Sequence, residues 1–227
     1  ILLEIIFLGT GTSYGVPVIG CNCETCTSNN PKNTRYRSSI FIKYSNLSLL
    51  IDTPPEMRLQ LLENNITNID SILFTHSHAD HLMGFDDVRA FNKIHNKSIP
   101  CYGNQRTIKR IKKAFSYIFN TIQIGGGVPE VSLNVIDSVF HINGIKITPL
   151  PVKHGKLNIL GYKINNLAYM TDCSHIPEST MKKIQGIDTL IIDALRYKPH
   201  STHMNISQAL KVIDNLNVNK AYFTHLS

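Results

Sequence analysis

The segment Phe74-Thr75-His76-Ser77-His78-Ala79-Asp80-His81 follows an apolar run and places three imidazoles and a carboxylate within six residues. In an extended chain, residues two positions apart project to the same side, so His76 and His78 can bind one metal ion. Asp80 and His81 follow where the chain turns, and they can face a second ion. Few structural roles require these residue types together at a strand end. The segment therefore predicts a site for two metal ions at the edge of a sheet.

The composition is that of a globular protein with an excess of basic residues and histidine. Of the 227 residues, 42% are hydrophobic and 17% are charged, against about 25% in an average soluble chain. This balance excludes a disordered chain. The sequence holds 23 Lys and Arg, 16 Asp and Glu, and 10 His, which gives a net charge of +7. A basic surface suits an anionic partner.

The length predicts a single domain over 1–227. No apolar run approaches the roughly 20 residues that a membrane span needs. The opening 1–8 carries Glu4 and lacks the basic start of a signal peptide, so it is expected to be a strand. We expect a cytoplasmic protein with no membrane contact. The oligomeric state is left open, and a homodimer is compatible with the sequence.

Apolar periodicity predicts strands alternating with helices. The predicted strands cover 2–8, 39–44, 47–51, 71–74, 99–102, 131–136, 139–142, 145–150, 157–164, 167–170, 189–193 and 221–224, and the predicted helices cover 56–64, 86–94, 104–119, 177–183 and 207–216. Asn143-Gly144 and Asn165-Asn166 are expected to form hairpin turns. β-rich halves with helices between them predict the α/β (α+β) class, as a four-layer αββα sandwich with sheets packed face to face.

The histidine motif resembles the His-x-His-x-Asp-His signature of the metallo-β-lactamase superfamily, and three later sites follow in that family's order. They are Pro151-Val-Lys-His154, Ala168-Tyr-Met-Thr-Asp172 and Tyr222-Phe-Thr-His225. The resemblance covers nearly the whole chain and implies a centre of two divalent ions, Zn or Mn. It assigns the ligands as His76, His78 and His154 for one ion, Asp80, His81 and His225 for the other, and Asp172 as the bridge. It also implies that Asp52, at the end of Leu49-Leu-Ile-Asp52, orients the metal loop. A plain turn residue is the alternative for Asp52.

The cysteine cluster Cys21-Asn-Cys23-Glu-Thr-Cys26 indicates a second kind of metal site. Three cysteines at this spacing cannot bridge one another without strain, and five cysteines in all argue against a disulfide-stapled secreted fold. The cluster resembles the PhnP-type phosphoribosyl cyclic phosphodiesterase branch. That resemblance implies a structural Zn held by three thiolates in the loop 20–27 and by a C-terminal histidine. The histidine would follow His225 and is not in this sequence, so the fourth ligand stays open. The other two cysteines are expected to be buried.

The branch resemblance implies hydrolysis of a cyclic or small phosphodiester by a metal-bridged hydroxide. A histidine must protonate the departing alkoxide. His203 matches the family's catalytic histidine best by its distance from the following helix, with His200 as the alternative, and Asp80 is expected to help position the hydroxide. The candidates for holding a substrate phosphate are Arg35, Arg37, Ser38, Ser39 and Arg196, which are also ordinary surface residue types.

Other activities are compatible with the same motif. A ribonuclease Z-like tRNA 3′-processing endonuclease shares the opening Phe7-Leu-Gly-Thr-Gly11, and the basic run Lys109-Arg-Ile-Lys-Lys113 would suit RNA phosphates. No long insertion that could grip tRNA is visible, and that enzyme lacks the cysteine cluster. Apolar residues at 108, 111 and 115 make the basic run typical of a solvated helix face. We therefore expect a small phosphorylated substrate, with nucleic acid less favoured. β-Lactam or thioester hydrolysis and a non-catalytic metal-binding module are further alternatives.

Overall fold

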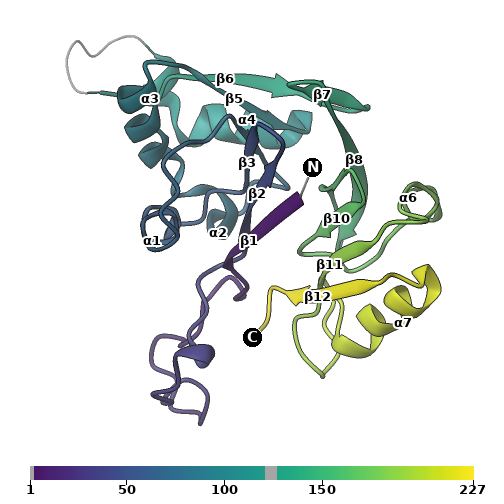
Figure 1. Ribbon diagram of the computed structural model, residues 1–227. Helices are drawn as coiled ribbons and strands as arrows, with labels where there is room; N and C mark the ends of the chain where they lie inside the picture. The colour runs from purple at the N-terminus through teal and green to yellow at the C-terminus, as the bar shows by residue number, and fades with distance from the viewer. Residues whose placement is uncertain (1–2, 121–126) are drawn as a thin grey trace. The chain divides into compact units, whose positions relative to one another are not determined.

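The computed structural model describes residues 3–120 and 127–227. The chain divides into two compact units, of which unit 1 comprises 1–9 and 39–137 and unit 2 comprises 10–38 and 138–227. Each unit contains one six-stranded sheet with helices (Figure 1). The predicted α/β class is confirmed, whereas the single domain stays a prediction. Within the described ranges, no helix combines the length and the apolarity that crossing a bilayer requires.

Unit 1 has a mixed sheet in which the strands follow one another in chain order. β1 to β3 pair antiparallel, and β3 to β6 pair parallel. The strands are β1 (Leu3–Gly9), β2 (Ser39–Tyr44), β3 (Leu47–Ile51), β4 (Ser71–Leu73), β5 (Ile99–Gly103) and β6 (Val131–Val135). The helices are α1 (Met57–Glu63), α2 (Ala79–Leu82), η2 (Phe85–Val88), α3 (Arg89–His95), α4 (Gln105–Ala114) and α5 (Ser116–Phe119).

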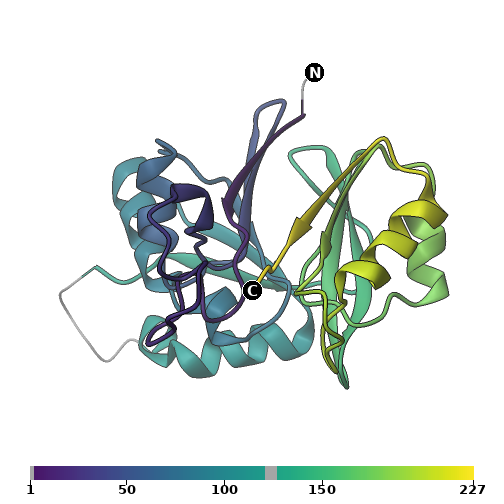
Figure 2. The same ribbon diagram turned by 90° about the horizontal axis from the view of Figure 1, so that it is seen from below.

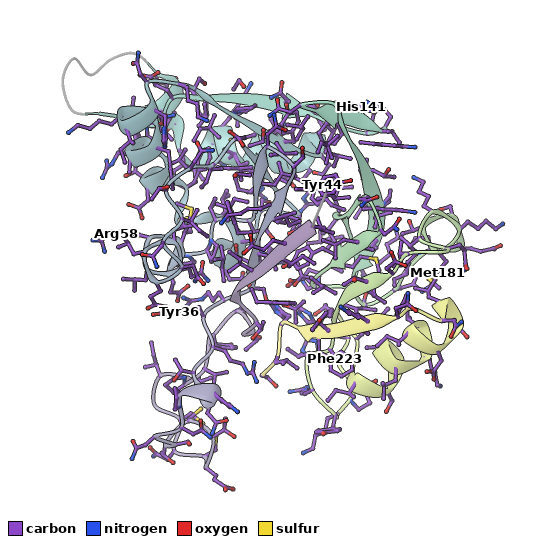
Figure 3. The ribbon with its side chains drawn as sticks, viewed as in Figure 1. Tyr36, Tyr44, Arg58, His141, Met181 and Phe223 are labelled. Carbon is purple, nitrogen blue, oxygen red and sulfur yellow. The ribbon has the colours of Figure 1, made fainter. Side chains whose placement is uncertain are left out.

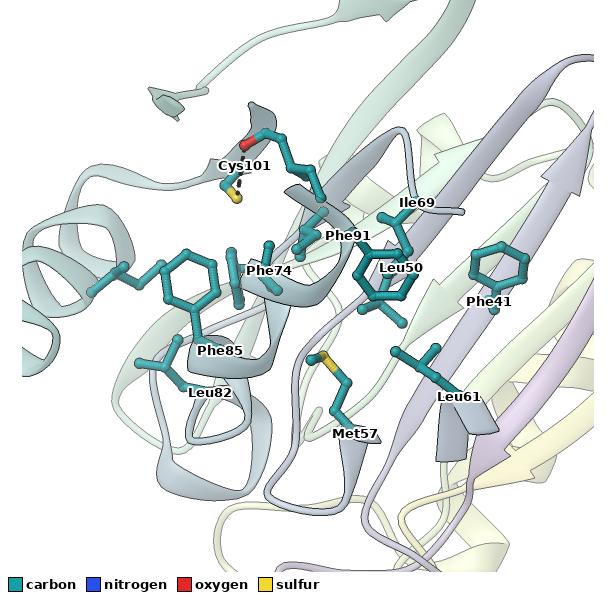
Figure 4. Packing of buried hydrophobic residues seen from close by; sticks show 14 of the residues in the cluster. Phe41, Leu50, Met57, Leu61, Ile69, Phe74, Leu82, Phe85, Phe91 and Cys101 are labelled. Carbon is teal, nitrogen blue, oxygen red and sulfur yellow. Dashed lines mark hydrogen bonds between the residues drawn. The ribbon is translucent and has the colours of Figure 1, made fainter. Parts of the chain in front are cut away.

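The core of unit 1 joins the sheet to its helices. Phe41 and Leu50 from the sheet belong to one buried cluster with Met57 and Leu61 of α1 and Phe91 of α3 (Figure 4). Fully burying a side chain of this kind stabilises the fold by about 1.5–3 kcal/mol. This packing fixes the ends of the parallel strands, from which the polar segments 52–56 and 74–81 emerge.

Unit 2 has the sheet order β12-β11-β10-β9-β8-β7. α6 and α7 lie on one face of this sheet (Figure 2), and both contribute residues to its apolar cluster. The strands are β7 (Phe140–Ile142), β8 (Ile145–His154), β9 (Leu157–Ile164), β10 (Leu167–Met170), β11 (Thr189–Asp193) and β12 (Lys220–Thr224). The helices are η1 (Pro31–Asn33), α6 (Glu178–Lys183) and α7 (Ile206–Leu216). Both predicted hairpin turns are confirmed, because β7 pairs with β8 and β9 with β10 in antiparallel fashion.

Three predicted elements differ from the structure by more than one residue at an end or by an interruption. The helix expected over 104–119 is interrupted at Phe115, which has φ −114° and ψ 44° and is buried between α4 and α5. The helix expected over 86–94 is a 3-10 turn, η2, followed by α3. β8 runs on to His154 despite Pro149 and Pro151. The prolines are tolerated because β7 pairs only with 145–147, so that at Pro149 and Pro151 β8 pairs with β9 alone, whereas Lys153 further along makes a bridge with His175. Leu2, the predicted start of the first strand, lies outside the described residues.

Candidate metal centre

In unit 1, three histidines and an aspartate gather beyond the end of β4. The His76 ring lies with its centroid 4.5 Å from that of His78 and 4.3 Å from that of His81. His78 is the N-cap of the short helix α2, with φ −69° and ψ 155°, and α2 turns the chain so that Asp80 Oδ2 lies 3.2 Å from His81 Nε2. His76, Asp80 and His81 are buried and His78 is exposed. The four side chains of the motif therefore converge, as the spacing predicted.

Asp52 connects this cluster to the end of β3. Its Oδ2 atom accepts hydrogen bonds from His81 Nδ1 at 2.8 Å and Thr75 Oγ1 at 2.7 Å, and its Oδ1 atom accepts the Thr75 N–H at 2.8 Å. Complete burial raises the pKa of Asp52, although the charge of His81 and these hydrogen bonds oppose the shift. Because Nδ1 of His81 is bonded to the carboxylate, Nε2 is the atom that can bind a metal ion.

In unit 2, four buried side chains come together from the ends of different elements. His154 ends β8, Asp172 follows β10 and His225 follows β12, while His203 comes from the loop before α7. His154, Asp172 and His203 each offer a ligand atom within 4.8 Å of the others. The rings of His203 and His225 stack with centroids 4.8 Å apart. His154 Nδ1 donates to the carbonyl of Thr202 at 2.8 Å, which again directs Nε2 to a ligand.

Asp193, at the end of β11, is a functional candidate that the sequence reasoning missed. It is fully buried, and its Oδ2 atom accepts hydrogen bonds from His203 Nδ1 at 2.9 Å and from the Cys173 N–H at 2.8 Å. Asp193 ends an apolar strand, as Asp52 does, and this position in the sequence could have indicated that it orients a histidine. The hydrogen bond to Asp193 fixes the orientation of the His203 ring and keeps a proton on Nδ1. When the ring is protonated, its second proton is on Nε2.

His200 lies close to His203 but in a different environment. Its ring centroid is 5.2 Å from that of His203, and its Nδ1 atom accepts the Thr202 N–H at 3.3 Å. His200 is exposed. Its pKa is lowered by partial desolvation and then by the positive charges of His203, Arg196 and His154. Both candidate acids therefore lie in one loop, but only His203 is shown with a carboxylate partner.

The candidate phosphate-binding residues divide into buried and accessible ones. Ser38 and Ser39 are buried, and their hydroxyls donate to the carbonyls of Gly11 at 2.9 Å and Ile51 at 2.8 Å. The binding of a substrate phosphate by Ser38 or Ser39 stays a prediction, which the burial of both residues and these hydrogen bonds do not favour. Ser38 Oγ instead lies 3.4 Å from His225 Nδ1.

The arginines keep more of their donors accessible. Arg37 is half-buried and its Nε donates to the carbonyl of Ser13 at 2.7 Å. Arg35 is half-buried as well, and its Nη1 donates to Thr10 Oγ1 at 2.8 Å. Arg196 is exposed. Each guanidinium has further N–H groups with which it could bind an anion.

The thiols of Cys21, Cys23 and Cys26 lie within 4.8 Å of one another in the segment 17–34, which extends away from the strands of unit 2 (Figure 1). Figure 3 labels Tyr36, where this segment rejoins the rest of the unit. The backbone N–H of Cys26 and then the thiols of Cys21 and Cys26 lower the pKa of Cys23. The Val18 N–H bonds Cys26 Sγ at 3.3 Å and opposes a rise in the pKa of Cys26, which burial and the neighbouring thiols nevertheless produce.

Three converging thiols fit a Zn site chemically, because thiolates are the preferred soft ligands of that ion. The two remaining cysteines, Cys101 and Cys173, are fully buried as expected, and burial raises the pKa of both. They behave as small hydrophobic residues.

Comparison with known proteins gives consistent matches. The model of a family described as the β-lactamase superfamily domain matches residues 48–226. A crystal structure described as a new diphosphatase from the PhnP family is 39% identical, with a TM-score of 0.91, and the alignment covers 100% of this chain and 88% of that one.

Two curated relatives match over less of their own length. An octanoyltransferase of Porphyromonas gingivalis is 34% identical over 99% of this chain and 46% of its own length. A ribonuclease Z of Clostridioides difficile is 23% identical over 82% of this chain and 64% of its own length. The chain thus spans about half to two thirds of these relatives.

Proposed function

Because this chain belongs to the β-lactamase superfamily, a superfamily of hydrolases that includes metal-dependent members, we propose that it is a metal-dependent phosphohydrolase. The proposed substrate is a cyclic or small phosphodiester, with phosphoribosyl 1,2-cyclic phosphate as the type. Its two sheets with helices are those of the metallo-β-lactamase fold. The similarity to a protein described as a PhnP-family diphosphatase supports a phosphorus–oxygen bond as the target. The observation that carries the proposal is the buried Asp193–His203 pair among imidazole and carboxylate donors.

The donor chemistry fits divalent ions of the Zn or Mn type. Following the superfamily pattern, we assign His76, His78 and His154 to one ion, Asp80, His81 and His225 to the other, and Asp172 to both. Bound ions of this kind lower the pKa of water and neutralise charge on phosphoryl oxygens. Asp52 keeps His81 in the tautomer that binds through Nε2, and the Thr202 carbonyl does the same for His154.

The proton needed by the leaving group comes from His203 in this proposal. Asp193 accepts a hydrogen bond from Nδ1–H of His203 and stabilises the protonated ring, so that Nε2–H can donate its proton to the departing alkoxide. Asp80, besides binding an ion, accepts a hydrogen bond from the attacking water. His200 differs from His203, because its Nδ1 atom accepts a hydrogen bond from the Thr202 N–H and therefore does not donate one to a carboxylate. We therefore favour His203 as the general acid.

We further propose that Cys21, Cys23 and Cys26 hold one structural Zn ion. The experiment for both metal sites is elemental analysis of the full-length protein, compared with a variant in which Cys23 is replaced by Ser. The variant should lose the structural ion and keep the ions at the histidine and aspartate donors. Equal metal content in the two proteins would contradict a separate cysteine site.

The proposed reaction is tested with a substrate panel on the same metal-loaded protein. The panel contains phosphoribosyl 1,2-cyclic phosphate, bis(p-nitrophenyl) phosphate, a diphosphate ester, a β-lactam and a thioester. Activity on the phosphorus compounds is expected. Activity confined to the β-lactam or the thioester would overturn the proposal. His203→Ala should retain its metal ions and lose about 10²–10⁴-fold in turnover on the cyclic phosphate.

A second candidate function, tRNA 3′ processing, is favoured by the surface of α4. This helix exposes five cations, has no acidic residue and buries Ile108 and Ile111. The five cations are Arg106, Lys109, Arg110, Lys112 and Lys113. If this function holds, the protein should cleave a 3′-extended tRNA precursor, and binding should weaken steeply with salt. Similarity to ribonuclease Z at 23% identity supports testing it.

A further inference from the structure

The loop 195–204, between β11 and α7, presents an exposed aromatic ring between two cations. Arg196, Tyr197 and Lys198 are all exposed, and Tyr197 is 82% exposed. Single exposed rings are ordinary on protein surfaces. What distinguishes Tyr197 is its place in an anchored loop that also carries His203.

Hydrogen bonds fix both ends of this loop. The Leu195 N–H donates to the carbonyl of Met204 at 2.9 Å, and the Ile206 N–H donates to the carbonyl of Arg196 at 3.1 Å. Near its end, the Thr202 carbonyl accepts the hydrogen bond from His154. Pro199 restricts the backbone between these anchors. The loop can be followed below β12 in Figure 1, beside the end of the chain. Tyr197 is therefore an exposed residue of a loop whose two ends are fixed, and it lies six positions before His203 in the sequence.

Backbone hydrogen bonds join this loop to three further segments that together contain cations and no Asp or Glu, whereas the carboxylate that the loop contacts, Asp193, is fully buried beneath it at His203. The carbonyl of Leu195 in the loop accepts the Ser227 N–H at 2.9 Å, which joins the loop to 225–227. The carbonyl of Leu226 accepts the Thr12 N–H at 2.9 Å, and the carbonyl of Tyr36 accepts the Gly11 N–H at 2.8 Å, which add the segments 10–16 and 35–38. We call the joined segments 10–16, 35–38, 195–204 and 225–227 the loop surface. It contains Arg35, Arg37, Arg196 and Lys198 and no Asp or Glu. A surface of this kind attracts an anionic ligand.

We propose that Tyr197 stacks on the base of a nucleoside-containing substrate while cations of the loop surface bind its phosphate. The inference rests on the proposed phosphohydrolase function and narrows its substrate class. Among cyclic or small phosphodiesters, nucleoside derivatives should bind more tightly than base-free sugar phosphates such as phosphoribosyl 1,2-cyclic phosphate, which remain substrates of lower affinity. Every nucleobase has a π face, and stacking on an aromatic side chain is worth about 1–3 kcal/mol. A sugar phosphate without a base has no aromatic ring that could stack on Tyr197.

The test compares two ligands that differ essentially by the base, adenosine monophosphate and ribose 5-phosphate. Their affinities for the metal-loaded full chain are measured by isothermal titration calorimetry, in the wild-type protein and in Tyr197→Ala and Tyr197→Phe. Tyr222→Ala is the control, because Tyr222 is an exposed tyrosine of the same unit outside the loop surface. Wild-type protein should bind adenosine monophosphate more tightly by about 5–150-fold, the equivalent of 1–3 kcal/mol.

Tyr197→Ala should abolish this preference without changing the affinity for ribose 5-phosphate, and Tyr197→Phe and Tyr222→Ala should retain it. Equal affinity for the two ligands in the wild-type protein would overturn the proposal. So would a preference that survives in Tyr197→Ala, because the base would then bind elsewhere. These are binding measurements, so they remain decisive if hydrolysis of phosphodiesters fails. Conversely, hydrolysis without a base preference would leave the proposed function standing and remove only this inference.

Discussion

Two buried aspartates perform corresponding tasks in the two units. Asp52 closes β3 and bonds Nδ1 of His81, and Asp193 closes β11 and bonds Nδ1 of His203. An imidazole whose Nδ1 is bonded to a carboxylate has a fixed ring and a defined tautomer. The difference lies in the assigned task, because His81 is a proposed ligand and His203 a proposed acid. The Asp193 contact should therefore affect proton transfer more than metal binding.

The first prediction concerns Asp193→Asn, which keeps the size of the side chain but removes its charge. Turnover of a substrate with an alkoxide leaving group should fall by about 10–10³-fold, since the protonated His203 loses its stabilising partner. Hydrolysis of bis(p-nitrophenyl) phosphate should fall much less, because p-nitrophenolate departs without a proton. Metal content should be unchanged. Equal losses on the two substrates would show that Asp193 does not act through the proton donor.

The second prediction concerns Asp70, which joins the start of β3 to the start of β4. Its carboxylate accepts hydrogen bonds from the Ser48 N–H at 2.8 Å, Asn68 Nδ2 at 3.1 Å and Lys97 Nζ at 3.1 Å. Partial burial acts to raise the pKa of Asp70, but these three donors lower it overall. A lowered pKa stabilises the folded state above the unfolded value of about 3.9. That stability is lost as the pH falls through the folded pKa.

Asp70→Asn should therefore cost about 1–2 kcal/mol of unfolding free energy at pH 7. The cost should begin to shrink as the pH falls below about 4, where Asp70 of the unfolded chain binds a proton first, and should be lost once the pH falls through the lower pKa of the folded carboxylate. Urea denaturation of both proteins at pH 7 and at acidic pH measures the difference. A cost that is the same at every pH would mean that the charge of Asp70 is not involved.

At the scale of elements, β9 and β10 are held so closely that one position admits only glycine. A Cβ atom on Gly161 would lie 2.6 Å from the Tyr169 carbonyl oxygen and 2.7 Å from Met170 Cγ. Gly161→Ala should therefore destabilise the protein by about 1–3 kcal/mol through overpacking. Gly127→Ala is the control, because none of the residues that the structure describes has an atom within 4 Å of its Cβ position. Thermal unfolding of the two variants measures the contrast, and equal midpoints would contradict the tight packing of β9 on β10.

The sequence predicted elements best where apolar residues alternate between turn signals. β2, β3, β9, β10 and β11 have the predicted bounds, because each is a compact apolar run. The four-residue helix α2 was missed because a single turn shows no helical periodicity. The break at Phe115 was missed because its apolar side chain continues the periodic pattern, whereas tertiary packing buries it between two short helices. The site showed the same limit. Closely spaced motifs predicted the donors, but Asp193 is separated from His203 by 10 positions in the sequence, and only the fold brings the two side chains together.

At the scale of the whole molecule, the proposed dinuclear centre should contribute to stability as well as to catalysis. Its buried donors include the carboxylates of Asp80 and Asp172 and the imidazoles of His81 and His225. Without ions these groups lose the interactions that their desolvation requires. Removal of the ions should therefore lower the stability of the folded chain.

Chelation of the metal-loaded protein should accordingly lower its unfolding temperature. An ion present at about 100 times its dissociation constant stabilises the folded state by about 2.7 kcal/mol, and two such sites by about twice as much. For a chain of this length, 1 kcal/mol corresponds to about 2–4 °C, so we expect a decrease of about 10–20 °C. Differential scanning calorimetry before chelation, after it and after Zn is restored measures the effect. A Cys23→Ser variant should still show most of the decrease, since its dinuclear donors are intact. His76→Ala should show much less, because its dinuclear site is already impaired, and equal decreases in these two variants would locate the stabilising ion outside the proposed centre.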